Sequence, residues 1–437
     1  MSGRTIKAAT ALALAWCALS GTALAASPPP ASSTPAALLG GINVDLQGSG
    51  PSVAERVIAQ AVALHAKIIR TEVSWASVAP RAAGELNARA LGYTDRLLSD
   101  AAAQGIRVIV MVDVTPCWAS SAPAELLSSC APGARSPANS WPPARPADFA
   151  AFARQLAARY GNEITALEVW NEPDQANQKY FAGPEKAARY AAMLKAAYPA
   201  IKEVDPSILV LGGSIVGSNG VFLRLLYQDG IKGFYDGLAV HYYTLTLAAI
   251  RAIHTVQLEN GDSTPLWLDE FGWGDCYPRQ RIQEEQACVT AAVQAQNITN
   301  VYRALSTTNY IAAATIYELQ DGGGDSFGVL TGSGARKPAF RALAGALAGG
   351  GGAQSPVTLA LRREHGRLRA SGGAPVGDYM QLEAFAGRTL RYRATFTLNR
   401  FNRYSLLLPA VLGTRHLRVR VYQLWAGPSR AAQRSVS

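Results

Sequence analysis

The amino-acid sequence predicts a (β/α)8 TIM barrel followed by a small antiparallel β-sandwich-like domain. Eight short apolar segments recur along residues 38–348, and each is followed by a stretch with helical periodicity. Continuous apolar runs that alternate with amphipathic helices are typical of parallel strands buried on both faces. Eight such units in about 300 residues fit a closed barrel better than an open doubly wound sheet, which usually has fewer strands.

Residues 1–25 have the three parts of a secretory signal peptide. Arg4 and Lys7 precede an apolar stretch, which ends at the small-x-small sequence Ala23–Ala25. This stretch is shorter than the roughly 20 residues of a membrane span, although an uncleaved inner-membrane anchor is the alternative. Residues 26–37 are rich in Pro, Ser and Ala and form a predicted tether. We therefore expect a periplasmic or secreted protein.

The predicted barrel strands are short and rich in apolar or β-branched residues. In chain order they are Gly41–Leu46, Lys67–Glu72, Arg107–Asp113, Ala166–Glu172, Ile208–Gly213, Gly237–Tyr242, Leu266–Glu270 and Ala312–Leu319. The helices between them include Ala147–Tyr160 and Glu185–Val204, in which apolar residues recur at helical spacing. The last barrel helix is predicted at Pro338–Ala348.

A glycine-rich linker, residues 349–356, ends the barrel because no regular element tolerates such a run. Residues 357–437 then alternate apolar and polar side chains, which predicts strands with one buried face. The predicted strands are Val357–Leu361, Arg367–Ala370, Tyr379–Ala384, Leu390–Leu398, Tyr404–Leu408 and His416–Tyr422. Since no convincing helix interrupts them, we expect an antiparallel β domain.

The basic charge of the chain is confined to this last domain. The formal net charge is +10, and the segment from Ser355 to the C-terminus holds 14 arginines, no lysine and three acidic residues. The rest of the chain is therefore close to neutral, which argues against a nucleic-acid-binding protein. The arginines would either form a solvated surface or contact an anionic glycan or a membrane surface.

Four cysteines remain after the predicted signal peptide: Cys117, Cys130, Cys276 and Cys288. An even number of cysteines in an exported chain suggests disulfides. Three pairings are possible, and we favour Cys117 with Cys130 and Cys276 with Cys288 because each pair lies within one connecting segment. The cysteines lack C-x-x-C spacing and a neighbouring histidine, so a metal site is not predicted.

Two glutamates close the fourth and seventh predicted strands. Glu172 ends the sequence Leu-Glu-Val-Trp-Asn-Glu, and Glu270 follows Leu-Trp-Leu-Asp. A single acid at such a position would suit the N-terminus of the next helix. Two acids at the carboxyl ends of barrel strands favour catalysis, and a pair of carboxyl groups is what cleavage of a glycosidic bond requires.

The segment Trp170–Pro173, together with the glutamate of the seventh strand, resembles the signature of clan A, the large clan of retaining (β/α)8 glycoside hydrolases. The resemblance implies that Glu172 is the acid/base, Glu270 the nucleophile and Asn171 the donor to the sugar 2-hydroxyl. In a retaining enzyme the two carboxyl groups lie roughly 5 to 5.5 Å apart.

Two further positions match supporting residues of the clan. Arg70, at the end of the second predicted strand, matches the arginine beside the nucleophile, and His241–Tyr243 matches an H-x-Y element. This implies that Tyr243 donates a hydrogen bond to Glu270. No metal and no organic cofactor is predicted, because the sequence has no H-E-x-x-H and no P-loop, and Gly212–Val216 fails the nucleophile-elbow pattern.

Within the clan, the sequence most resembles glycoside hydrolase family 39. The resemblance spans Leu38–Ala348 and includes Tyr317–Asp321, Phe327–Leu330 and Lys337–Phe340 behind the catalytic motifs. That family includes β-xylosidases, α-L-iduronidases and periplasmic glycosidases of bacterial exopolysaccharide operons. An exported chain with a β domain behind its barrel resembles the exopolysaccharide group most.

Aromatic side chains on the segments after the strands are candidates for stacking on sugar rings. They are Trp75, Trp118, Trp141, Tyr180, Trp273 and Tyr277, and each has the alternative of packing beneath a loop. Trp170 and Tyr317, from the two motifs above, are further candidates for contact with the substrate or support of the site.

We therefore predict a retaining glycoside hydrolase that cleaves a polysaccharide or oligosaccharide, specifically a bacterial exopolysaccharide, by endo-acting double displacement. One alternative is an exo-acting glycosidase similar to a β-xylosidase. Another is a non-catalytic carbohydrate-binding protein of polysaccharide biosynthesis. The presence of Glu172, Glu270, Asn171 and Arg70 argues against the non-catalytic alternative.

Overall fold

The computed structural model describes residues 37–44, 50–278, 287–322, 324–349, 356–376, 378–413 and 416–436. Three predicted features lie wholly or mostly outside the described residues. They are the predicted signal peptide (1–25), the predicted tether (26–37) and the predicted linker (349–356). Of the tether only residue 37 is described, and of the linker only residues 349 and 356. The end of the first predicted strand at Leu46 also lies outside them.

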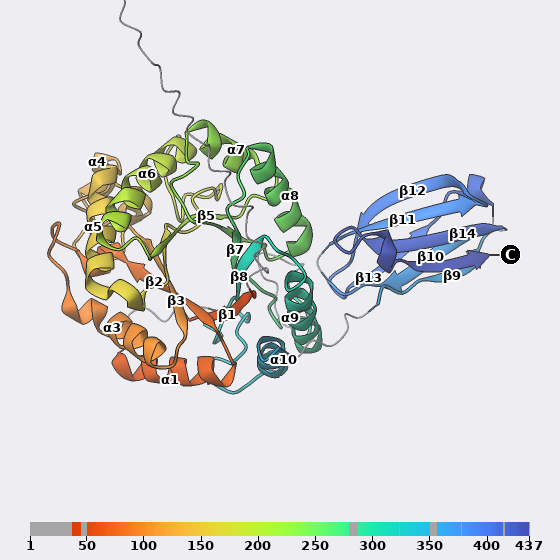
Figure 1. The fold of residues 1–437 in the computed structure, drawn as a ribbon, viewed down its shortest axis with the longest axis horizontal. Coiled ribbons are helices and arrows are strands. Elements are labelled where there is room, and N and C mark those ends of the chain that lie inside the picture. Colours follow the sequence, from red (N-terminus) through yellow and green to blue (C-terminus); the bar gives the residue numbers. More distant parts are fainter. Residues whose placement is uncertain are drawn as a thin grey trace, which may run out of the picture. The chain divides into compact units, whose positions relative to one another are not determined.

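Eight parallel strands close into a barrel in sequence order, which confirms the predicted fold class (Figure 1). They are β1 Leu39–Asn43, β2 Ile68–Ser74, β3 Arg107–Asp113, β4 Ala166–Val169, β5 Leu209–Ile215, β6 Gly237–His241, β7 Leu266–Phe271 and β8 Ile311–Ile316. The last strand closes the ring by pairing with the first, for example Thr315 with Gly41. All eight predicted strands are present, and their observed ends differ from the predicted ends by at most three residues.

Helices surround the strands in Figure 1. They are α1 Pro51–Ala63, α2 Trp75–Val78, α3 Ala88–Ala103, α4 Ala124–Leu127, α5 Pro146–Tyr160, α6 Lys186–Val204, α7 Val221–Gln228, α8 Thr246–Glu259, α9 Ala291–Leu305 and α10 Pro338–Leu347. Proline opens α5 and α10, and the Thr290 side chain accepts a hydrogen bond from the Val293 amide at the start of α9. Among the described residues, no helix combines the length and apolarity that crossing a membrane requires.

An apolar layer fills the interior of the barrel. It consists of Ile68, Ile109, Ala166, Leu211, Ala239, Trp267 and Ala313. Trp267 fits because Gly237 on the neighbouring strand has no side chain, and a Cβ atom at that position would collide with the indole ring. Since side chains two residues apart along a strand point to the same side, the next inward-facing layer lies toward the carboxyl ends of the strands.

The C-terminal residues form two antiparallel sheets, ordered β13-β10-β9 and β12-β11-β14-β15, consistent with the predicted β-sandwich-like domain. The strands are β9 Ala360–Glu364, β10 Arg367–Gly373, β11 Tyr379–Ala386, β12 Thr389–Thr397, β13 Arg403–Leu407, β14 Leu417–Gln423 and β15 Ala432–Val436. β9 begins three residues later than predicted, and β15 has no counterpart among the predicted strands. Both are polar edge strands, so their sequences lack a clear apolar alternation.

The structure joins Cys117 to Cys130 and Cys276 to Cys288, the pairing favoured from the sequence. The first disulfide follows β3 and the second follows β7, so both lie at the carboxyl ends of barrel strands. Disulfides persist in oxidising compartments. Their presence therefore fits an extracellular or periplasmic protein.

Candidate active site

A layer of charged side chains lies inside the barrel, two residues beyond the apolar layer. It consists of Arg70 on β2, Glu168 on β4, His241 on β6 and Asp269 on β7. Each of these residues is at most 4% exposed. Because isolated charges are costly in such surroundings, the four groups must satisfy one another or neighbouring polar groups.

Strand β7 presents two consecutive acids to this layer. In a regular strand Asp269 and Glu270 would point to opposite faces. The register between β6 and β7 shifts between Val240 and His241, which is the irregularity of a β-bulge. As a result both carboxyl groups reach Arg70, with Nη1 2.7 Å from Oε1 of Glu270 and Nε 3.6 Å from Oδ2 of Asp269.

Arg70 connects the charged layer to the residues above it. Its Nε and Nη2 donate to the two oxygens of Glu168 at 2.7 and 3.0 Å. Nη1 donates to Glu270 at 2.7 Å and to Asn43 at 3.1 Å, and Nη2 donates to Oδ1 of Asn171 at 3.1 Å. Burial opposes the charge of Arg70, but Glu168 and Glu270 raise its pKa well above its ordinary value.

Glu270 is held at both carboxylate oxygens. Arg70 donates to Oε1, and the hydroxyl group of Tyr243 donates to Oε2 at 2.7 Å. Burial and the charge of Glu270 raise the pKa of Tyr243 well above its ordinary value, so the hydroxyl keeps its proton for this bond. The structure thus places Arg70 and Tyr243 on either side of the predicted nucleophile.

Glu172 lies just beyond β4, in a left-handed backbone conformation with φ of 45°. Its Oε1 lies 2.9 Å from Nδ1 of His241, and its Oε2 accepts a hydrogen bond from Nε2 of Gln175. One oxygen each of Glu172 and Glu270 and one ring nitrogen of His241 all lie within 4.8 Å of one another. This separation suits a retaining pair, whereas inverting pairs stand roughly 6.5 to 9.5 Å apart.

The buried charges shift one another's pKa values. Burial, together with the charge of Glu168, raises the pKa of Asp269 well above its ordinary value. Burial also opposes the charge of Glu168, but Arg70 lowers the pKa of that carboxyl group. For His241, burial lowers the pKa, but the charge of Glu270 and the hydrogen bond with Glu172 raise it to about 9. The shifts therefore favour a protonated Asp269, an ionised Glu168 and a protonated His241.

Two neighbouring cavities lie at the site, and the glutamate pair lines one of them. One has a volume of about 1090 Å³ and is lined by Glu172, Glu270 and His241 among others. The other, of about 870 Å³, lies against the loop that follows β3 and includes Arg135. The residues that line both are Glu72, Asn171, Tyr180, Tyr317 and Asp325. The two cavities thus form a groove that extends beyond the glutamates.

Three predicted tryptophans do not line this groove. Trp170 is fully buried, and its indole N–H donates to the carbonyl of Tyr180 at 3.0 Å. Trp118 packs against the core and donates to the carbonyl of Ala79 at 2.8 Å, and Trp273 is 5% exposed. These three rings pack into or against the core beneath the loops and line neither cavity, so the structure gives no support to their stacking on sugars.

Two of the three tyrosine candidates lie differently. Tyr180 and Tyr317 line both cavities. Tyr317 also packs edge-on against Tyr243, with ring centroids 6.0 Å apart. Trp75, in contrast, is fully buried. Of the aromatic candidates, Tyr180 and Tyr317 therefore border the site, whereas Tyr277 lines neither cavity.

Some residues of the site were given no role from the sequence. Glu168 and Asp269 each interrupt an apolar strand, and a charged residue there is unusual enough to signal a buried charge network. Ser214, which donates to Glu168 and to the carbonyl of Trp170, lies on β5. Gln175 lies in the loop after β4, where no sequence pattern distinguishes it.

In the part of the chain that the structure describes, two groups of three side chains have the spacing of metal ligands. They are Glu168, His241 and Asp269, and Glu172, His241 and Glu270. Arg70 binds a carboxylate of each group, through Glu168 and Glu270. A metal ion would therefore face the guanidinium group at close range, and we assign no metal to either group.

The sequence matches the model of the cellulase family (glycosyl hydrolase family 5) over residues 36–309, more than half of the chain. No curated protein matches the sequence. Similar solved structures include a family 39 glycoside hydrolase from Bacteroides cellulosilyticus WH2, with a TM-score of 0.56 and 16% identity, over 89% of this chain and 81% of that one.

Two further structures have the same fold. A family 39 β-xylosidase from Caulobacter crescentus aligns with a TM-score of 0.53 and 18% identity, over 80% of this chain and 82% of that one. A family 39 enzyme from Xanthomonas axonopodis pv. citri aligns with a TM-score of 0.51 and 15% identity, over 87% and 97%. Together with the family match, these likenesses confirm the predicted resemblance to clan A and its family 39 members.

Proposed function

The chain belongs to the cellulase family, glycosyl hydrolase family 5, and from this premise we propose that it is a retaining endo-glycosidase that cleaves a bacterial exopolysaccharide outside the cytoplasm. The membership makes the protein a glycosidase of clan A. One observation carries the proposed mechanism: Glu172 and Glu270 approach within 4.8 Å beside an open groove.

In the first step, a carboxylate oxygen of Glu270 attacks the anomeric carbon and the bond to the glycosidic oxygen breaks. Glu172 gives its proton to the departing oxygen, so the leaving chain departs as a neutral alcohol. Arg70 and Tyr243 hold Glu270 in place. Because Oδ1 of Asn171 accepts from Arg70, its amide N–H groups are left to donate to a sugar hydroxyl.

In the second step, Glu172 is a carboxylate and acts as the base. It takes a proton from a water molecule, whose oxygen attacks the anomeric carbon while the ester bond to Glu270 breaks. Gln175 and His241 hold the two oxygens of Glu172, which supports this role. The enzyme returns to its starting state, and the sugar keeps its anomeric configuration.

The groove supports an endo-acting enzyme, because two adjoining cavities offer room for sugars beyond the glutamate pair. The two disulfides lie near the carboxyl ends of barrel strands and fit an extracytoplasmic location. The predicted signal peptide adds to this, since a periplasmic or secreted enzyme meets polysaccharides of the cell surface.

A second candidate function is that of an exo-acting glycosidase. The solved structure from Caulobacter crescentus is that of a β-xylosidase and has the same fold. An exo-acting enzyme would release single sugars and would cleave short aryl glycosides.

The experiment that tests the proposed roles uses the variants Glu172→Gln and Glu270→Gln. We expect each to lower the rate of glycoside cleavage by roughly 10²- to 10⁴-fold, because each loses a proton donor or a nucleophile. Fragment masses from a panel of bacterial exopolysaccharides give the measurement. The control is Glu203→Gln, a surface residue paired with Arg154, which should keep the wild-type rate. Wild-type rates in both site variants would contradict the proposal.

A further inference from the structure

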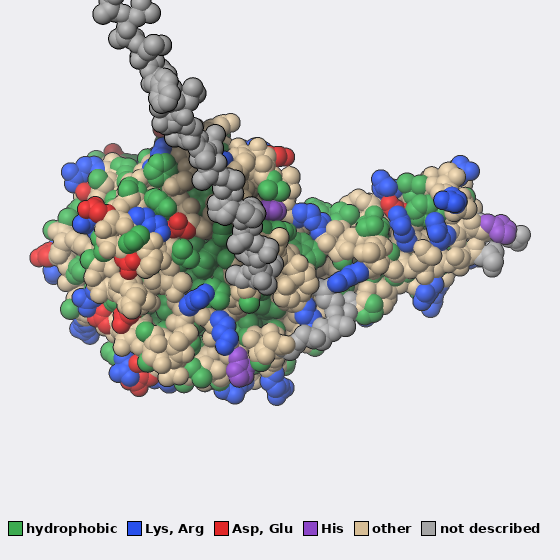
Figure 2. Space-filling view, viewed as in Figure 1, with side chains coloured by type: hydrophobic (Ala, Val, Ile, Leu, Met, Phe, Trp, Pro, Cys, Tyr) green, Lys and Arg blue, Asp and Glu red, His purple; other side chains and the backbone are tan. Residues whose placement is uncertain are grey.

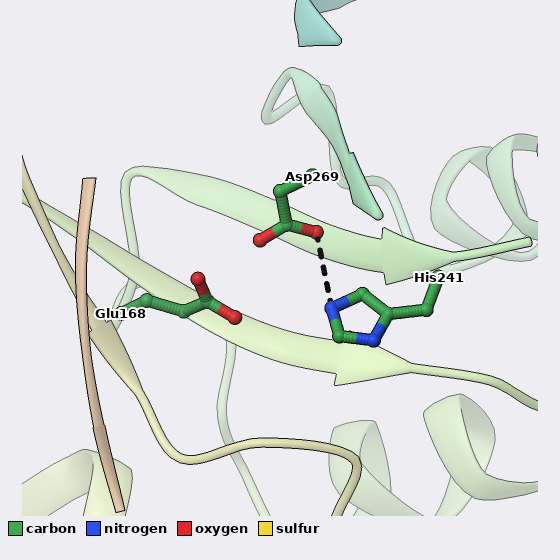
Figure 3. Close-up of side chains that lie close together, drawn as sticks. All are labelled: Glu168, His241 and Asp269. Carbon is green, nitrogen blue, oxygen red and sulfur yellow. Dashed lines mark ion pairs between the residues drawn. The ribbon is translucent and has the colours of Figure 1, made fainter. Parts of the chain in front are cut away.

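A buried contact beneath the glutamate pair has no role in the steps above. Nε2 of His241 lies 3.5 Å from Oδ1 of Asp269, as the dashed line in Figure 3 shows. Both side chains are completely buried. Among the described residues, the carboxylate of Asp269 finds no hydrogen-bond donor, and Nε2 of His241 has no other acceptor. Since buried polar groups need partners, the two side chains are suited to each other.

The other ring nitrogen of His241 faces both catalytic glutamates. Nδ1 lies 2.9 Å from Oε1 of Glu172 and 3.4 Å from Oε2 of Glu270. A hydrogen on Nδ1 can therefore bond to either carboxylate with a small change in direction. Without a hydrogen, Nδ1 could accept only from the protonated Glu172 and would turn its lone pair toward the carboxylate of Glu270, which is unfavourable.

The charges around His241 balance only if its ring carries both hydrogens. The groups that face it or lie one contact away are Arg70 from β2, Glu168 from β4, Glu172 after β4, Tyr243 after β6, and Asp269 and Glu270 from β7. The cations are Arg70 and protonated His241. The anions are Glu168 and, at each stage of the double displacement, one of the two catalytic glutamates. With Asp269 in the protonated form that its raised pKa favours, the buried site has no net charge throughout.

We propose that Asp269 is a positioning residue that keeps a hydrogen on Nδ1 of His241, and that this N–H group follows the negative charge from Glu270 to Glu172 during the reaction. The proposal rests on the proposed roles of the two glutamates. Asp269 acts by accepting the hydrogen of Nε2, while its own hydroxyl group faces the carboxylate of Glu168.

The charge moves in the following way. Before the first step the negative charge lies on Glu270, and Glu172 holds its proton. When Glu270 forms its ester bond and Glu172 releases its proton to the leaving oxygen, the charge lies on Glu172. Water then restores the first state. His241 gains and loses no proton in either step, so its N–H group stabilises both the nucleophile and the base.

Two variants of Asp269 separate positioning from packing. Asp269→Leu removes the acceptor for Nε2. Burial of the ring, which disfavours its charged form, should then outweigh the remaining contacts, and the pKa of His241 should fall by more than about one pH unit. Asp269→Asn keeps an acceptor oxygen of nearly the same shape, so the doubly protonated ring should persist. Asp262→Asn, at a buried aspartate in the segment before β7, is the matched control and should leave His241 unchanged.

The measurement is the ring ¹⁵N spectrum of histidine-labelled protein between about pH 6 and pH 10, which distinguishes the two neutral tautomers from the doubly protonated ring. The chain has five histidines, and the variant His241→Gln assigns the signal. We expect the wild-type ring to be doubly protonated at neutral pH and to titrate near 9. A neutral ring at pH 7 in the wild type would overturn the proposal, and so would an unchanged titration in Asp269→Leu.

The same spectra of Glu172→Gln and Glu270→Gln test whether the N–H group follows the charge. Glu270→Gln imitates the charge of the ester intermediate, and Glu172→Gln imitates the resting enzyme. The Nδ1 hydrogen should persist in both variants, and its loss in either would contradict the proposal. These spectra need no substrate, so they test the role of His241 independently of activity. A protein that fails to cleave glycosides would refute the proposed function, and the spectra could still be interpreted.

Discussion

At the scale of single residues, one guanidinium group organises the active site. Arg70 donates five hydrogen bonds to four side chains, two of them parallel bonds to Glu168. A lysine has three donors around one point and cannot present the planar fork that binds a carboxylate through two bonds. Arginine at this position therefore fixes the geometry of several side chains at once.

Loss of Arg70 should be costly because it leaves buried acids uncompensated. We expect Arg70→Met to lower the free energy of unfolding by about 3 to 5 kcal/mol, the range for breaking a buried ion pair. Adding Glu168→Gln should recover part of the lost stability, since the second change removes the buried carboxylate that Arg70 no longer neutralises. Urea unfolding of both single variants and the double variant measures the coupling. Additive losses would show that the two residues are not coupled.

The pH dependence of stability follows from His241. Its pKa of about 9 in the folded protein lies above the unfolded value of about 6.5, so the folded state binds more protons between these values. This stabilisation is fully present below about pH 6.5 and is lost as the pH rises through about 9, in total on the order of 3 kcal/mol. The raised pKa of Asp269 acts in the same direction.

The variant His241→Gln checks this prediction, because it removes the titrating ring. Urea unfolding of the wild type should become easier between about pH 6.5 and pH 9, and the variant should show a smaller slope over that range. Parallel slopes for the two proteins would mean that other groups cause the dependence.

At the scale of elements, the strands could be predicted from the sequence and the bulge could not. Apolar runs marked all eight barrel strands, and the motifs at the ends of β4 and β7 marked Glu172 and Glu270. The bulge that turns both Asp269 and Glu270 inward depends on how β7 pairs with its neighbours. That register results from packing of the whole barrel, so a single segment does not contain it.

The positions of the tryptophan rings in the loops could not be predicted from the sequence either. An indole ring after a strand suits a sugar or a core equally well, because both offer it an apolar contact. Trp118 and Trp273 packed into the core, while Tyr180 and Tyr317 stayed at the groove. The direction of each loop decides between the two outcomes, and that direction is set by residues far away in the chain.

The disulfide Cys117–Cys130 should stabilise the wall of the groove. It closes a loop of 13 residues, directly before Gly133–Ser140, which contributes residues to the smaller cavity. We expect the double variant Cys117→Ser/Cys130→Ser to have a free energy of unfolding that is lower by about 2 to 4 kcal/mol. It should also cleave polymer less well than short substrates.

The second disulfide offers the matched control. Cys276–Cys288 closes a loop of similar size, 12 residues, so the entropic effect of its removal should be similar. None of the residues of this loop that the structure describes lines the smaller cavity. If removal of either disulfide changed polymer cleavage equally, the first would have no particular role in the groove.

At the scale of the whole molecule, the charge of the chain is unevenly distributed. Figure 2 shows basic and acidic side chains mixed over the barrel, and mainly basic ones over the visible face of the C-terminal sheets. Several arginines of the C-terminal sheets have partners within their own sheets. Arg393 and Arg420 pair with Glu383, and Arg369 pairs with Glu364. The hypothesis of contact with an anionic glycan or a membrane therefore gains no support from the structure.

From the shape of the groove we predict how the enzyme acts on a polymer. An endo-acting enzyme binds sugars on both sides of the cleaved bond, so early products should be long fragments and the average mass should fall before single sugars appear. Size-exclusion chromatography of an exopolysaccharide digest measures this. Ala134→Trp places a bulky side chain in the smaller cavity and should reduce polymer cleavage while sparing short aryl glycosides. Ala131→Trp, in the same exposed loop but outside the cavity lining, is the control. Release of single sugars from a polymer of nearly constant mass would instead identify an exo-acting enzyme.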